Sequence, residues 1–354
     1  MGIYFAAYSL IFLASIWKVG KTPGLKRRNQ GVFVFWILFS LLALRHPSMG
    51  TDLAYGRNYG YLGQFAYISD LPWRDVFRYR IFNYEQGYIV FNKLISRISE
   101  EPQFFLAFCA AATLGPVLYT IYQRSHYPVL SVIIFMGLPT FLLQYSGIRQ
   151  SIALGIIFVS MRYIQEHSLW KFLAAVFLAM QFHTSGWIFL AAYPIYHFSM
   201  RRTWRILTCF LPPVFFLWRY PLFQLLSKLL AEDAAVDHNN AITLFLVFYA
   251  VYLFCCIFSG EQQDIAGLKN LFLVACCIQA LAGVNAIVIR AGYYYMNSLI
   301  LLLPTITGRM KNRENARILN CLMHICFTLF GLYAVYTSSW AAAYPYRWFW
   351  NPRF

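Results

Sequence analysis

Apolar runs of about 15 to 20 residues recur from one end of this 354-residue chain to the other. A helix of that length crosses the hydrocarbon core of a bilayer. The runs are continuous, unlike the alternating strands of a membrane barrel. Charged residues make up only 12% of the chain, about half their share in a soluble domain. We therefore predict an all-α, polytopic integral membrane protein.

The runs predict about twelve transmembrane helices within a single domain, residues 1–354. No basic residue precedes the first run, so we expect a retained helix and not a cleaved signal peptide. The predicted crossings lie near residues 2–17, 31–44, 103–121, 128–144, 150–163, 170–182, 186–199, 206–218, 241–258, 270–288, 292–307 and 318–337.

Basic residues in short loops predict the orientation of the chain. One set of connections is rich in them, and we predict that this side is cytoplasmic. The opposite side carries a long loop, residues 45–101, and a shorter one, residues 219–240. The basic set includes Lys18, Lys21, Lys26, Arg27, Arg28, Arg124, Arg162, Lys171, Arg201, Arg202, Arg205, Lys269, Arg309, Lys311, Arg313 and Arg317.

The formal net charge of +16 favours anionic partners. No nucleic-acid-binding module is recognisable, and the charge is distributed between apolar runs. Anionic lipid headgroups and phosphate-bearing substrates are therefore the expected partners, and nucleic acid is not. No nucleotide-binding fingerprint or metal-ligand spacing is present either, so the sequence predicts no cofactor and no metal.

Four polar segments lie at predicted membrane boundaries on the outer side. YSGIRQSIALGI, residues 145–156, places Arg149 and Gln150 between two apolar runs. The others are LRHPSMGTDLAY from Leu44, FHTSGW from Phe182 and RAGYYY from Arg290. A charged residue at such a boundary is costly and usually serves a partner or a function. Their common side predicts a functional site.

Arg149 and Arg290 are predicted in tight loops at helix starts. The free N–H groups of a helix start bind anions, and an arginine fork added there suits a phosphate or diphosphate. The alternative is an arginine that reaches to the interface for its own solvation. Two arginines in equivalent places, with Gln150 beside one of them, favour the anion site.

Three residues are candidates for proton transfer. Asp52, in a turn after Arg45, is either a turn residue, a general base or a carboxylate that positions Arg45. Glu85 opens EQGYIVFNKLISRI, predicted as an amphipathic helix on the outer surface, where it could simply complement the helix dipole. His183 is either a structural residue or a donor or proton carrier, with Thr184 and Ser185 able to cap the next helix.

Tyrosines near these residues could offer faces for sugar stacking. They are Tyr55, Tyr59 and Tyr61 near Asp52, and Tyr293, Tyr294 and Tyr295 after Arg290.

Six motifs in order give the chain a resemblance to the EpsG-like branch of the Wzy polysaccharide polymerases. They are LRHPSMGTD with Tyr55, EQGY, GIRQSIA, FHTSG, RAGYYY and the late YPYRW, from Tyr344 to Trp348. The resemblance extends over nearly the whole chain, and GIRQSIA followed by FHTSG is the most specific part. One departure is HPS, which separates Arg45 from Met49 and Gly50.

The resemblance implies a GT-C-like glycosyltransferase at the outer face of the bacterial inner membrane. Such enzymes polymerise O-antigen or exopolysaccharide from oligosaccharide repeat units on undecaprenyl diphosphate, which serve as donor and acceptor. A chain-length regulator is a common partner in the family. Because the diphosphate is itself the leaving group, neither metal nor nucleotide is required.

A mechanism follows as a hypothesis. Arg149, with Arg290 and with Arg45 or Arg347, would hold the donor diphosphate, and Gln150 and Tyr294 belong to the same predicted binding set. A carboxylate would take the proton of the acceptor hydroxyl, and we favour Asp52 over Glu85 and Glu85 over His183. One base acting against an in-line leaving group would invert the linkage.

Other functions remain open from the sequence. An O-antigen ligase has a similar layout but passes glycan to a different acceptor. A transporter or flippase of lipid-linked glycan would place charges near mid-membrane and often has inverted repeats, and neither feature is visible. A membrane acyltransferase would use a boundary histidine, but flanking arginines suit a diphosphate better.

Overall fold

The computed structural model describes residues 1–16, 22–53, 60–78, 83–199, 206–230, 242–258 and 262–351. The described part is helical apart from its connections and one isolated β-bridge between Arg45 and Trp348. Several residues named above lie outside the described residues: Lys18, Lys21, Tyr55, Tyr59, Arg201, Arg202 and Arg205.

Helix starts follow from local sequence. Proline occupies the first turn of several helices, where its missing N–H costs no hydrogen bond. The helices are α1 (Gly2–Ile16), α2 (Pro23–Ala43), α3 (Tyr61–Asp70), α4 (Trp73–Arg78), α5 (Gln86–Ser96), α6 (Pro102–Arg124), α7 (Pro128–Gly137), α8 (Pro139–Ser146), α9 (Ile148–Gln165), α10 (Leu169–Met180), η1 (Thr184–Ala191), α11 (Ala192–His197), η2 (Thr208–Phe210), α13 (Leu211–Leu217), α14 (Arg219–Leu230), α15 (Ile242–Phe258), α16 (Gln263–Ala280), α17 (Ala286–Met296), α18 (Ser298–Gly308), α19 (Arg313–Thr337) and η3 (Ser339–Ala341).

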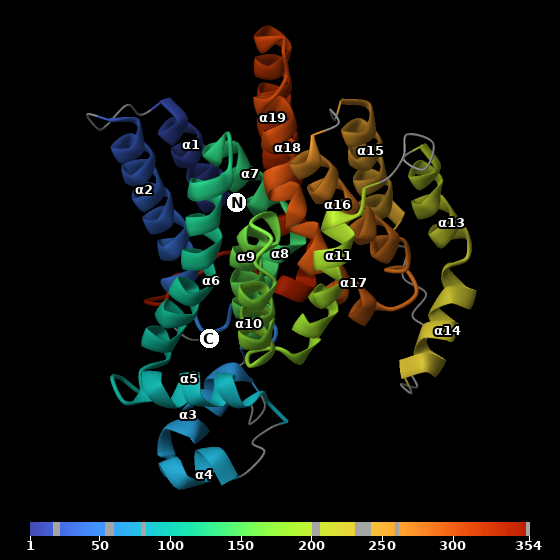
Figure 1. Ribbon diagram of the computed structural model, residues 1–354. Helices are drawn as coiled ribbons and strands as arrows, with labels where there is room; N and C mark the ends of the chain where they lie inside the picture. The colour runs from blue at the N-terminus through green and yellow to red at the C-terminus, as the bar shows by residue number, and fades with distance from the viewer. Residues whose placement is uncertain are drawn as a thin grey trace.

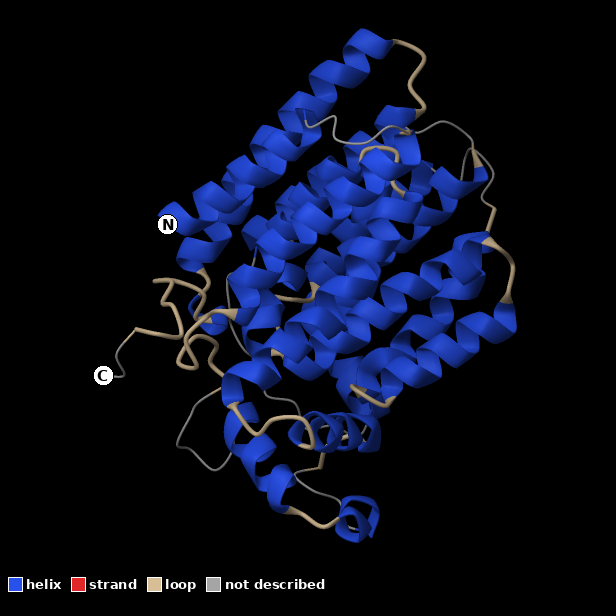
Figure 2. Cartoon of the chain, turned by 90° about the vertical axis from the view of Figure 1, so that its left-hand side faces the viewer, coloured by secondary structure: helices blue, strands red, loops and turns tan. Residues whose placement is uncertain are grey.

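The long helices form a bundle, and α3, α4 and α5 lie across one end of it (Figure 1). Within the bundle, α6 packs against α2 and α9, and α9 packs against α10. The long helix α19 packs against α7 and extends beyond the opposite end of the bundle (Figures 1 and 2). The end that carries α3 to α5 is therefore distinct from the end where α19 begins.

The centre of the bundle is formed by α7, α8 and α18, in which almost every side chain is buried. The axis bends by 61° between α7 and α8, where Pro139 begins the second segment. Proline cannot donate the backbone hydrogen bond that would continue the first helix, so a break at this point is expected.

Two described helices, α6 and α19, are each long and apolar enough to cross a bilayer. The bent pair of α7 and α8 passes the same test when taken together, and α1, α10, α15 and the segment Thr208–Leu217 are shorter apolar helices. Many apolar side chains on the outside of the bundle are exposed, including Phe5, Trp36, Phe177 and Leu329. An apolar exterior of this kind suits a lipid environment, and the protein is a membrane protein.

One predicted helix boundary was wrong. The connection 45–101 contains α5, where an amphipathic helix was expected, together with α3 and α4, and α14 lies within the connection 219–240. The predicted crossing 270–288 is α16, which begins at Gln263 and ends at Ala280. Successive turns follow α16 from Leu281 to Val284, where Gly283 favours a break. Arg290 consequently lies inside α17 and not in a loop at a helix start.

Candidate functional site

A cavity of about 310 Å³ lies where six separate segments of the chain meet. These segments are the turn after α2, the start of α3, the residues preceding α5, the start of α9, the connection from α10 to η1, and α17. The cavity therefore gathers residues from all four polar segments of the sequence. It is lined by Thr51, Asp52, Gly60, Tyr61, Tyr84, Gly147, Arg149, Gln150, His183 and Arg290.

Arg149 lies in the first turn of α9, as predicted, after Gly147 at the N-cap. Its guanidinium carbon lies 3.9 Å from the centre of the Tyr84 ring, a cation–π contact. A terminal nitrogen lies 2.5 Å from a carboxylate oxygen of Glu85. The Nε atom is buried and has no hydrogen-bond partner within the described residues. A fixed guanidinium beside a helix start can bind an anion.

Glu85 holds two elements together through its carboxylate. One oxygen pairs with Arg149, and the other accepts a 2.8 Å hydrogen bond from the backbone N–H of Thr184, at the start of η1. Its side chain is only 9% exposed. The backbone N–H of Thr184, in the first turn of η1, is thus hydrogen-bonded to Glu85 and not to the side chains of Thr184 or Ser185, which the sequence suggested as caps. This geometry fits a positioning role for Glu85.

His183 belongs to a chain of hydrogen bonds behind the cavity. Its Nδ1 lies 2.6 Å from the Ser185 hydroxyl, which lies 3.0 Å from the Tyr294 hydroxyl. Burial lowers the pKa of His183 to about 4; the charge of Glu85 opposes this shift, and those of Arg149 and Arg290 act with it. The imidazole is therefore neutral near pH 7. Tyr294 is fully buried and does not line the cavity.

Asp52 lies in the turn after α2, with its side chain exposed at the cavity. The Thr51 hydroxyl, 3.3 Å from the carboxylate, also lies 2.8 Å from the backbone carbonyl of Trp340. One hydroxyl has a single proton to donate, so the shorter contact to Trp340 is favoured. Across the described ranges, no cation forms an ion pair with Asp52. Its carboxylate is accordingly available to a ligand.

The turn that presents Asp52 depends on Gly50. The φ of Gly50 is +106°, and a Cβ atom there would lie 2.0 Å from the backbone carbonyl oxygen of Tyr145. Only glycine tolerates both conditions. The backbone N–H of Thr51 donates a 2.9 Å hydrogen bond to Ser146, which joins this turn to the end of α8.

Gln150 and Arg290 connect α9 with α17. The Gln150 amide donates a 2.8 Å hydrogen bond to the backbone carbonyl of Arg290. The Arg290 side chain is exposed and lines the cavity, as does Arg149 at the start of α9. Two arginines from different helices therefore face one space that also contains a carboxylate.

Arg45 and Arg347 do not line this cavity. Arg45 is 2% exposed, donates a 2.9 Å hydrogen bond to the Gln144 carbonyl and lies 4.9 Å from the Tyr145 ring centre. The backbone carbonyl of Arg347 accepts a 2.8 Å hydrogen bond from His46. The segments around Arg45 and Arg347 are thus hydrogen-bonded to each other near the C-terminal end of the described chain, and both stabilise the fold there.

Two tyrosines line the cavity beside Asp52 and Arg149. Tyr61 is one of those suggested for sugar stacking, and burial raises its pKa to about 12, so it remains a phenol at neutral pH. Tyr84 was missed by the sequence reasoning. Its position directly before EQGY was the available signal, because Glu85 was already a candidate.

The site thus combines cations, aromatic faces, a neutral imidazole and an accessible carboxylate. Such a set can bind an anionic ligand and accept a proton beside it. Within the described ranges, no cluster of three or more His, Cys, Asp or Glu side chains is arranged to hold a metal ion.

These features define a helical membrane protein with an arginine-rich cavity at one end of its bundle. The sequence model of the EpsG family matches residues 28–348, nearly the whole chain, and the protein belongs to this Wzy-like polymerase family. The family is associated with glycosyltransferase-like polymerase activity. No curated protein sequence and no solved structure matches the chain.

Proposed function

We propose that the protein polymerises oligosaccharide repeat units carried on undecaprenyl diphosphate, at the outer face of the bacterial inner membrane. The observation that carries this proposal is the cavity that Arg149, Arg290 and the accessible carboxylate of Asp52 line together. Family membership supports a polymerase acting on lipid-linked saccharides. The GT-C-like architecture and the single catalytic domain form part of the same proposal.

The donor diphosphate binds between Arg149 and Arg290. Asp52 accepts the proton of the acceptor hydroxyl, whose oxygen attacks the anomeric carbon of the donor sugar. The bond from that carbon to the diphosphate breaks, and the arginines stabilise the charge that the leaving undecaprenyl diphosphate gains. Attack opposite the leaving group inverts the linkage. Glu85 keeps Arg149 in place, and Tyr61 and Tyr84 border the part of the cavity where the sugars bind.

His183 has a supporting role in this scheme. A neutral imidazole of low pKa is a weaker base than one with an ordinary pKa. Its hydrogen bond to Ser185 orients the ring, so that its Nε2 can contact a substrate hydroxyl. Asp52 therefore remains the first choice for the base.

The test is a reaction with the purified full chain in detergent and synthetic lipid diphosphate-linked repeat units, with products separated on a gel. A ladder spaced by one repeat unit is expected from the wild type. Asp52→Asn should lower ladder formation by about 10²-fold or more, because an amide cannot accept the proton. Asp70→Asn, which changes an exposed carboxylate outside the cavity, is the matched control.

Two outcomes contradict the proposal. Intact passage of the lipid-linked unit across liposome membranes, with no ladder, would make the cavity part of a transporter. A wild-type rate in correctly inserted Asp52→Asn protein would remove Asp52 from the mechanism.

A further inference from the structure

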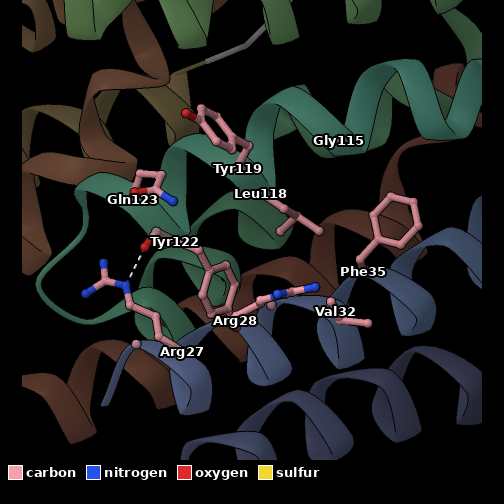
Figure 3. Close-up of a pocket in the computed structure, with 11 residues that line it drawn as sticks. Arg27, Arg28, Val32, Phe35, Gly115, Leu118, Tyr119, Tyr122 and Gln123 are labelled. Carbon is pink, nitrogen blue, oxygen red and sulfur yellow. Dashed lines mark hydrogen bonds between the residues drawn. The ribbon is translucent and has the colours of Figure 1, made fainter. Parts of the chain in front are cut away.

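A second cavity, of about 670 Å³, lies between α2 and α6 (Figure 3). It is formed by the first half of α2 and the second half of α6, whereas Asp52 follows the end of α2. It therefore lies toward the end of the bundle away from α3 to α5 (Figure 1). We call it the α2–α6 groove, and the residues used below are Arg27, Arg28, Val32, Phe35, Gly115 and Leu118.

The two arginines of the groove differ in their contacts. Arg27 donates a hydrogen bond to the backbone carbonyl of Tyr122, near the end of α6 (Figure 3), and a second to the carbonyl of Ser125, which follows α6. A cation there satisfies carbonyls that have no partner in the helix. The Arg28 side chain is exposed and extends along the groove beside Tyr122 and Val32. Within the described ranges it forms no ion pair, so its charge is available.

Most of the remaining groove surface is apolar, and Gln123, Tyr119 and Tyr122 also line it. Val32, Phe35 and Leu118 provide its surface, and Val32 is 50% exposed. A Cβ atom built on Gly115 would meet no atom within 4 Å, so the missing side chain leaves open space on α6. Trp36, four positions after Val32 and therefore on the same face of α2, is also exposed. This face of α2 therefore suits contact with lipid chains.

The groove lies on the side of the bundle that the basic loops predict to be cytoplasmic. Lys26, Arg27 and Arg28 follow one another in the first turns of α2, and Arg124 ends α6 nearby. Anionic lipid headgroups attract such clusters, at about 1 kcal/mol for each basic residue near the surface. A cation at one end of an apolar channel matches a phosphate headgroup with its acyl chain.

We propose that the α2–α6 groove binds an anionic phospholipid. The phosphate contacts Arg28, and an acyl chain follows Val32, Phe35 and Leu118 across the space above Gly115. This site is separate from the cavity of the proposed polymerase reaction. A lipid is favoured over a free phosphate because most of the groove surface is apolar, which a free anion would leave uncovered.

Native mass spectrometry of the full chain can test this proposal without any measurement of polymer synthesis. The protein is exchanged into a mixture of phosphatidylglycerol and phosphatidylcholine with identical acyl chains, and retained lipid is counted. We expect preferential retention of phosphatidylglycerol. Arg28→Gln should lower that preference about fivefold, while Arg317→Gln, an exposed arginine of α19 on the same side, should leave it unchanged.

The apolar part of the groove is tested separately. Gly115→Trp should displace the lipid by filling the space, and Gly115→Ala should retain it. If Gly115→Trp fails to fold, Gly115→Leu gives the same test with a smaller side chain.

The proposal is overturned by equal retention of the two lipids, or by an equal loss in Arg28→Gln and Arg317→Gln. Undiminished lipid retention in a folded groove-filling variant, Gly115→Trp or its replacement Gly115→Leu, would also overturn the proposal. So would displacement of the lipid by inorganic phosphate alone.

Discussion

A single substitution, Glu85→Gln, distinguishes a positioning role of Glu85, through its ion pair with Arg149, from a role as the general base. The glutamine oxygen can still accept the hydrogen bond from the Thr184 N–H, so the start of η1 stays satisfied. The charge that faces Arg149 at 2.5 Å is lost. Arg149 is then left partly buried without its counter-ion.

The cost follows from how little water reaches the pair. The side chains of Arg149 and Glu85 are 19% and 9% exposed. Exposed ion pairs contribute about 0.2–1 kcal/mol, whereas removing one partner of a buried pair costs about 3–5 kcal/mol. This pair lies nearer the buried case, and we expect a loss of about 2–3 kcal/mol in the free energy of unfolding. The thermal unfolding midpoint should fall on the order of 5 °C.

Activity should fall as well, because Arg149 is no longer held against the cavity. A misplacement of about 1 Å in a catalytic site can cost about 10²-fold in rate. The assay combines unfolding followed by intrinsic tryptophan fluorescence in detergent with ladder formation on a gel. The double variant Glu85→Gln with Arg149→Gln should recover part of the stability, since no unpaired charge remains, but no activity.

Asp52→Asn is the matched comparison, because its exposed carboxylate has no ion pair within the described ranges. It should lose activity with a change in unfolding free energy below about 0.5 kcal/mol. The reasoning is refuted if Glu85→Gln unfolds at the wild-type temperature, since the pair would then stabilise nothing. Loss of activity without loss of stability in Glu85→Gln would instead assign the base to Glu85.

Three further outcomes are expected. Arg290→Gln should lower ladder formation at least about tenfold and leave the unfolding midpoint unchanged, because the Arg290 side chain is exposed at the cavity. Arg317→Gln is the control, and equal rates of ladder formation in the two variants would contradict the diphosphate site. Gly50→Ala should lower the unfolding free energy by about 2–3 kcal/mol, since alanine at a φ of +106° would collide with the Tyr145 carbonyl; Gly2→Ala, at an open position, should change it little. The pKa of His183 is 6.5 in the unfolded protein and about 4 in the folded protein. Between these values the folded protein binds fewer protons at His183 than the unfolded protein, so the free energy of unfolding falls as the pH drops through this window. Above it, stability does not depend on the titration of His183. The unfolding midpoint of His183→Gln should therefore depend less on pH from 6.5 to 4, and identical pH profiles would refute the buried neutral state.

The predicted helices agree with most of the observed ones because apolar runs are a local property of the chain. The start of α9 at Arg149 and the end of α10 before His183 were both expected. The errors arose where polar residues lie inside helices. Arg290 was placed in a loop, but turns from Leu281 to Val284 end α16 earlier and leave Arg290 within α17.

The sequence alone determined that this chain forms apolar helices with polar residues at their boundaries. It also determined the family, through motifs spread over nearly the whole length. Only the tertiary structure decided which of the candidate site residues line the cavity and which do not. Asp52, Arg149, His183 and Arg290 meet at one cavity, while Arg45 is buried elsewhere.

The physical reason is that local patterns report burial and helix ends but not the partners of a charge. Glu85 and Arg149 are separated by 64 residues, and their pairing depends on how α5 and α9 each pack against α6. The same packing leaves the Asp52 carboxylate accessible to the cavity. Which carboxylate pairs with an arginine and which remains accessible is therefore decided by tertiary contacts.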